Sequence, residues 1–171
     1  DDVRTLLAAM GRAAGGDVAR RWIASAFVNL SRSAARALEL ATGEVRDVLV
    51  AMGMDAGCDE ARRCIASAVC NLADSALMAR HAVRDVLVAM GLCAGSDEAR
   101  RWIATAISNV ARSDDGERVM ARGEVWETLV LMGRAAGSDE ARRWVASAVA
   151  NTSHSDDSRR LIAEDLVAGM R

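Results

Sequence analysis

One stretch of sequence decides the fold: VRDVLVAMGLCAGSDEARRWIATAISNVA, at residues 83–111. Related versions begin at Val3, Val45 and Val125, so the four starting valines lie 42, 38 and 42 residues apart. Each version carries an asparagine near its end, and the four asparagines keep the same spacing. A period of about 40 residues indicates a repeat architecture, in which each unit buries its apolar face against its neighbours.

Each period carries three helix signals. In the last complete period, Ser113 and two aspartates favour a helix start, and Gly123 is expected to end this short helix in the left-handed conformation. A second helix should run from there to Gly133, and a third should follow Ser138, a good N-cap. The composition agrees, because alanine, leucine, arginine, glutamate and methionine favour helix and the chain has no proline. We therefore expect an all-α fold of short–long–long helical triplets.

The composition of the 171 residues also excludes several functional classes. The net charge of −2 disfavours a nucleic-acid partner, because nucleic-acid binders are usually strongly basic. No apolar run approaches the roughly 18 residues of a membrane span, and no signal peptide opens the chain. The four cysteines form no CxxC pair, which is typical of free thiols in a reducing compartment. We expect an intracellular protein, cytoplasmic or nuclear, and the lack of an initiator methionine leads us to expect a piece of a longer chain.

The ends of the third helices read AFVNLS, AVCNLA, AISNVA and AVANTS, and they resemble those of armadillo repeats of the β-catenin and importin-α type. The join NVARSDDGERVMARGEVWETLVLMG, at residues 109–133, resembles that family's passage from a third helix through a short first helix into a second. The resemblance implies a right-handed α-solenoid of stacked three-helix armadillo-like repeats. One departure is that Arg46, Arg84 or Trp126 stands where the family often has proline. HEAT-type repeats are the nearest alternative architecture.

The repeat boundaries follow from the asparagine positions. We expect a single repeat domain over residues 1–171, divided into a partial repeat of second and third helices (2–30), three repeats (31–72, 73–110 and 111–152) and a partial repeat with a first helix and the start of a second (153–171). The interval from Asn71 to Val83 is four residues shorter than its counterparts, which is about one helical turn. We therefore expect a shortened first helix in the repeat at 73–110, with locally altered stacking at residues 73–82.

The third helices determine what the molecule presents to a partner. At 100° per residue, Ile23 and Phe27 fall on an apolar face, and the asparagine lies beside it. Tryptophans, hydroxyl residues and glutamates share the asparagine stripe, with arginines along its border. The candidate peptide-binding residues are Asn29, Asn71, Asn109, Asn151, Trp22, Trp102, Trp144, Ser25, Ser67, Thr105 and Ser147. The flanking charges are Glu60, Glu98, Glu140, Arg21, Arg63, Arg101 and Arg143.

In armadillo repeats the third helices line a concave groove, and the resemblance implies that the four asparagines match that family's asparagine ladder. An amide offers both a donor and an acceptor, so it can pair with a peptide backbone whatever the peptide's side chains are. Tryptophan would add anchoring contacts. We therefore expect a non-enzymatic protein–protein interaction module that binds an extended peptide, without cofactor or metal. Importin-α-like binders carry tryptophan four residues before the asparagine, where this chain has serine or threonine, so we do not expect recognition of classical nuclear localisation signals.

Other interpretations of the same residues are open at this point. The asparagines can bond the backbone of the next repeat, and the tryptophans can serve mainly in packing. The chain can also be a structural segment of a longer solenoid scaffold that self-associates, or that contacts partners through its exposed ends, its edges or its convex face. A third hypothesis, disfavoured by the net charge, uses the arginine rows to bind anions or nucleic acid. Catalysis has little support, because His81 and His154 lack partners at metal-ligand spacing.

Overall fold

The computed structural model describes residues 2–169, and every regular element within that range is a helix, so the all-α expectation is confirmed. The helices are α1 (Asp2–Arg12), α2 (Asp17–Leu30), α3 (Ala34–Leu40), α4 (Gly43–Met54), α5 (Asp59–Leu72), α6 (His81–Leu92), α7 (Asp97–Val110), α8 (Asp114–Met120), α9 (Gly123–Ala135), α10 (Asp139–Thr152) and α11 (Asp156–Gly169). Each of the four sequence repeats therefore supplies one pair of long helices.

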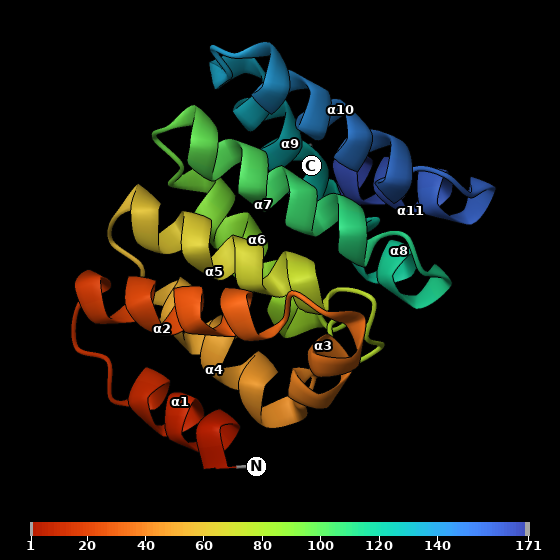
Figure 1. The fold of residues 1–171 in the computed structure, drawn as a ribbon. Coiled ribbons are helices and arrows are strands. Elements are labelled where there is room, and N and C mark those ends of the chain that lie inside the picture. Colours follow the sequence, from red (N-terminus) through yellow and green to blue (C-terminus); the bar gives the residue numbers. More distant parts are fainter. Residues whose placement is uncertain (1, 170–171) are drawn as a thin grey trace.

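The long helices form two rows (Figure 1). The asparagine row consists of α2, α5, α7 and α10, each packed against the next. The valine row consists of α1, α4, α6 and α9, and α11 packs against α9. The short helices α3 and α8 lie at one side of the molecule, near the carboxyl ends of the asparagine row (Figure 1). The sequence repeat thus becomes a repeat in space, with one helix of each row per unit.

The core fills the space between the two rows. The large side chains that are fully buried there include Phe27, Leu49, Ile65, Leu87, Ile103 and Leu129. Burying a side chain of this size stabilises the fold by roughly 1.5–3 kcal/mol. They belong to one continuous cluster that runs through all the repeats, so no repeat has a core of its own.

A side-chain hydroxyl group caps several of the helix starts. The hydroxyl oxygens of Ser33, Thr42, Ser96, Ser113 and Ser138 each accept a hydrogen bond from the backbone N–H three residues further along. Such a cap satisfies one of the N–H groups that a helix start leaves without a partner. The expected starts after Ser113 and Ser138 are confirmed by α8 and α10.

The expected helix ends at Gly123 and Gly133 are wrong. Gly123 is the first residue of α9, Gly133 lies within the same helix, and no glycine in the range 2–169 has a positive φ. At the same repeat position in the two preceding repeats, close packing within the valine row requires glycine. A Cβ on Gly91 would lie 2.5 Å from Thr128 Cγ2, and a Cβ on Gly53 would lie 2.5 Å from Val86 Cγ2.

The third repeat has no first helix, so the expectation of a shortened one is also wrong. Residues 73–80 form turns, closed by hydrogen bonds from Ser75 N–H to the Leu72 carbonyl and from Met78 N–H to the Ser75 carbonyl. The missing four residues leave too little chain for a helix between α5 and α6. Met78 is nevertheless fully buried, as Met120 is at the same repeat position of α8. The turns therefore keep the anchoring side chain while the helix around it is lost.

The last partial repeat begins with one continuous helix. α11 covers both the expected first helix and the expected start of the second. Asp165 stands at the repeat position of Gly123, and it follows Ala163 and Glu164, which favour helix, so nothing interrupts the helix there. Residues 170 and 171 of the expected repeat at 153–171 lie outside the described residues.

Candidate functional site

The asparagines of the asparagine row bond to the preceding repeat. Asn71 Nδ2 donates to Ser31 Oγ at 3.1 Å and to the Val28 carbonyl at 3.4 Å. Asn151 Nδ2 donates to Ser108 Oγ at 2.9 Å and to its carbonyl at 3.1 Å. These bonds tie the last turn of one helix to the last turn of the helix before it. An asparagine holding neighbouring repeats together was one of the open interpretations, but the bond runs to the repeat before and not to the repeat after.

Asn109 makes the same connection to a different acceptor. Its Nδ2 donates to Cys70 Sγ at 3.0 Å. Burial raises the pKa of the Cys70 thiol to about 11, and the bond from Asn109 only partly offsets that effect, so the thiol stays protonated. Asn29 differs from the other three asparagines, because it is exposed and makes no hydrogen bond to any described residue.

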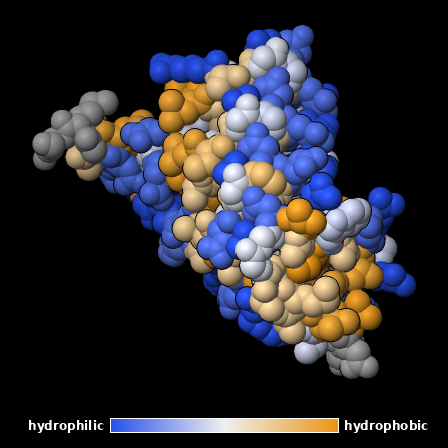
Figure 2. All heavy atoms as spheres, turned by 90° about the vertical axis from the view of Figure 1, so that its left-hand side faces the viewer, coloured by the Kyte–Doolittle hydropathy of each residue, from blue (hydrophilic) through white to orange (hydrophobic). Residues whose placement is uncertain are grey.

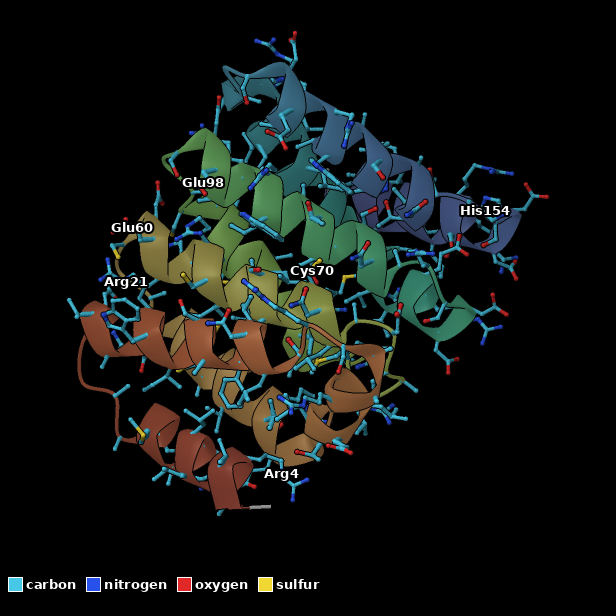
Figure 3. All side chains as sticks on the ribbon, viewed as in Figure 1. Arg4, Arg21, Glu60, Cys70, Glu98 and His154 are labelled. Carbon is cyan, nitrogen blue, oxygen red and sulfur yellow. The ribbon has the colours of Figure 1, made fainter. Side chains whose placement is uncertain are left out.

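The flanking charges form ion pairs between repeats. Arg21 lies 3.4 Å from Glu60, and Arg101 lies 2.7 Å from Glu140. Figure 3 shows Arg21, Glu60 and Glu98 along one edge, near the amino ends of their helices. The remaining pair joins Arg63 to Glu98 at 3.6 Å. Arg143 has no carboxylate within ion-pair distance among residues 2–169. These glutamates are largely exposed, so each pair contributes at most about 1 kcal/mol.

The three tryptophans of the candidate site differ in accessibility. Trp22 is 64% exposed, whereas Trp102 and Trp144 are half-buried and pack against the core. Each carries the guanidinium of the preceding arginine over its ring, 4.9–5.3 Å from the ring centroid. The indole Nε1 of Trp102 is buried and has no hydrogen-bond partner. Trp22 is therefore the tryptophan whose surface is most available to a ligand.

The hydroxyl residues lie between the helices of the asparagine row and not on its surface. Ser67 and Thr105 are buried, and Thr105 donates to the Arg101 carbonyl of its own helix. Ser25 Oγ donates to Cys64 Sγ at 3.5 Å, and Ser147 Oγ lies 3.0 Å from Ser108 Oγ. Neighbouring helices of the asparagine row therefore cover Ser67 and Thr105, and a peptide role for the hydroxyl residues stays a prediction.

A row of aspartates was missed as a connection between repeats. Asp59 Oδ1 accepts a hydrogen bond from Gly95 N–H at 3.1 Å, and the pairs Asp17–Gly57 and Asp97–Gly137 repeat this contact at 3.0 Å. Burial opposes ionisation of Asp59, but the bonds from Gly95, Ser96 and Arg62 outweigh it and lower the pKa of the carboxyl. The pKa of Asp17 is lowered in the same way. For Asp97 the bond from Gly137 is the largest cause of a lowered pKa. The available signal was the recurrence of glycine and aspartate in the loops GGDV, GCDE, GSDE and GSDE, which begin at residues 15, 57, 95 and 137.

A hollow of about 550 Å³ opens beside α3 and the turns that replace the missing helix. Its wall on α3 includes Ala34, Ala37 and Leu38. Asn71 and Asn109, near the carboxyl ends of α5 and α7, also line the hollow. The hollow therefore joins an apolar surface to two members of the asparagine row.

Residues 2–169 show little sign of a metal site or of a membrane span. No group of three or more histidine, cysteine, aspartate or glutamate side chains there is arranged to hold a metal ion. His81 and His154 are both exposed, and they lie in different repeats. None of the helices in this range combines the length and the apolarity needed to cross a bilayer.

Comparison with known proteins gives no family: no protein-family model and no curated protein sequence matches the chain. The function must therefore be argued from the asparagine row and the hollow beside it.

Proposed function

We propose that the chain is a non-enzymatic protein-interaction module, a right-handed solenoid of three-helix armadillo-like repeats that holds an extended peptide along the asparagine row. One observation carries the proposal. The amide nitrogens of Asn71, Asn109 and Asn151 are all used in bonds to the preceding repeat, whereas their side-chain carbonyls accept no hydrogen bond from a described residue. The internal bond fixes each amide, so the carbonyls recur once per repeat as acceptors without a partner.

The spacing of these acceptors suits an extended chain. Packed helices lie about 8–10 Å apart, and an extended chain rises about 3.3 Å per residue. A peptide crossing the row would therefore meet a new carbonyl every two to three residues, and its backbone N–H groups would donate to them. Each such bond contributes about 1 kcal/mol net, so the affinity depends on repetition along the row and on apolar contacts such as those of Trp22.

A display library of random 12-residue peptides provides the test. Peptides selected on the protein are labelled with fluorescein, and their affinity is measured by fluorescence anisotropy. The double variant Asn71→Ala/Asn109→Ala should bind them at least tenfold more weakly. Its fold is checked by circular dichroism, because both asparagines also join repeats. The matched control, Glu127→Ala/Arg134→Ala, removes exposed side chains of α9 in the other row and should bind as the wild type does. Equal affinity of the wild type and the asparagine variant would overturn the proposal.

A second candidate function rests on the end of the stack formed by α1 and the start of α2. Leu6 and Val18 are 58% and 68% exposed there, whereas Val48, the counterpart of Leu6 in the next repeat, is buried. Figure 2 shows orange, hydrophobic residues gathered at this lower end of the molecule. The face can support self-association or docking of a further repeat. Sedimentation velocity over a hundredfold range of concentration tests self-association, which Leu6→Glu should abolish.

A further inference from the structure

We propose that the hollow between α3 and the carboxyl ends of α5 and α7 is a specificity pocket, which takes one uncharged aliphatic side chain of the bound peptide. The inference rests on the proposed function and adds the class of residue that the peptide must carry. Its first support is a difference between the two short helices of the structure.

α8 is joined to the first helix of the next repeat, and α3 is not. The Glu117 side chain of α8 accepts a hydrogen bond from Ser155 N–H at 2.7 Å, just before the start of α11. The counterpart of Glu117 on α3 is Ala37, followed by Leu38 where α8 has Arg118. The next repeat has turns at residues 73–80 in place of a first helix, so no helix covers this apolar face of α3. Leu38 is 74% exposed. The sequence of α3 therefore provides an apolar surface where the regular repeat provides a polar contact.

The apolar face adjoins the groups expected to bind the peptide backbone. Asn71 and Asn109 line the same hollow as Ala37 and Leu38. In an extended chain, successive side chains point to opposite sides. A peptide whose backbone pairs with the two asparagines would therefore direct alternate side chains toward the row, and one of them would enter the hollow.

The charges in the hollow favour a neutral side chain. Arg32 and Asp74 are the charged residues in its lining, and neither forms an ion pair with a described residue. One positive and one negative charge leave no net attraction for a charged side chain. The volume of about 550 Å³ lies within the range of about 300–1,000 Å³ typical of ligand pockets. It is ample for leucine, isoleucine or methionine with part of the adjoining backbone.

The test replaces two residues of α3 with the residues that α8 has at the same repeat positions. Ala37→Glu and Leu38→Arg are made separately at positions that are not fully buried, and circular dichroism verifies the fold. The probe is a fluorescein-labelled 12-residue peptide obtained by selection on the wild-type protein. The selected peptides should share an aliphatic residue at one position, and replacing that residue with alanine should weaken binding at least tenfold. Each protein variant should cause a similar loss. The control Arg118→Leu, which places leucine on α8 outside the hollow, should bind within twofold of the wild type.

The outcomes separate this inference from the proposed function. The alanine-substituted peptide should bind wild type and Ala37→Glu equally, because the contact that the variant disrupts is already gone. If Asn71→Ala/Asn109→Ala weakens binding but neither α3 variant does, the pocket is overturned and the proposed function stands. Selected peptides that circular dichroism shows to be helical when bound would overturn the extended occupant. Failure to select any peptide would overturn both.

Discussion

The side-chain carboxylate of Asp59 accepts a hydrogen bond from the backbone N–H of Gly95, 3.1 Å away, although 36 residues separate them. The bond connects the first turn of one helix in the asparagine row to the loop before the next. Asp139 has the same sequence surroundings, SDEARRW in place of CDEARRC, but no glycine N–H among the described residues reaches it. Its side chain is fully exposed. The chain therefore contains its own control for this contact.

Asp59→Ala should destabilise the protein by about 1–2 kcal/mol, the range of a hydrogen bond to a charged group that is partly exposed. Asp139→Ala loses the same negative charge at a helix start and a similar ion pair, since Arg142 lies 2.9 Å from Asp139 as Arg62 does from Asp59. It should be close to neutral. Urea denaturation of both variants measures the difference, and equal losses would show that the Gly95 contact contributes nothing.

Acid should weaken the stack through the aspartate row. Asp17, Asp59 and Asp97 have a folded-state pKa below the ordinary value of 3.8. A carboxyl of this kind stabilises the folded state above its unfolded-state pKa, and the contribution is lost as the pH falls through its folded-state pKa. The melting temperature should therefore drop steeply below about pH 4. In thermal scans from pH 7 to 2.5, the melting temperature of the variant Asp17→Asn/Asp59→Asn/Asp97→Asn should fall less steeply than that of the wild type. The control Asp139→Asn should keep the wild-type profile.

Alanine at Gly91 should destabilise the protein by about 1–3 kcal/mol, as overpacking does. The new Cβ would lie 2.5 Å from Thr128 Cγ2, so α6 and α9 must move apart. At Gly133, the same position of the next repeat, the nearest atom would be Val145 Cγ1 at 3.4 Å. Gly133→Ala should therefore be neutral, or stabilising by up to about 1 kcal/mol from its better helix propensity. Thermal unfolding distinguishes the two, and a destabilised Gly133→Ala would contradict the packing argument.

Asn151→Ala should lower the stability by about 1 kcal/mol, because it removes bonds to Ser108. Asn29→Ala should leave it unchanged, since Asn29 has no internal bond. Chemical denaturation checks the pair. An equal effect at both positions would mean that the bonds from Asn151 to the preceding repeat contribute nothing to stability.

The spacing of the repeats was enough to predict the two long helices of each sequence repeat and which residues share a row. It could not predict what those residues touch, because a projection of one helix carries no information about its neighbours. Thr105 projects toward the asparagine stripe, yet α5 and α10 both pack against α7 and bury it. Glycine was misread for a similar reason. In a single sequence, a glycine that ends a helix and a glycine that admits a neighbouring helix look alike. Gly123 is of the second kind, because a Cβ there would lie 3.0 Å from Asp165 Cβ of α11.

The sequence did not predict the hollow itself, and it showed only that the interval from Asn71 to Val83 is shorter than its counterparts. The short interval after Asn71 predicted altered stacking, but a shortened helix and a lost helix differ by a few backbone bonds. Residues 73–80 form turns and not a helix, because turns bury Met78 in this shorter segment without a helix around it.

Three kinds of connection within the asparagine row have a direction. Arginine reaches forward to the next glutamate, aspartate accepts from the next glycine, and asparagine donates back to the previous helix. The two ends of the stack are therefore chemically different, like the ends of a polar filament. A unit duplicated in the interior would find a donor on one side and an acceptor on the other for each of these bonds. Such a chain can gain or lose whole units by duplication or deletion in its gene without any new contact having to arise.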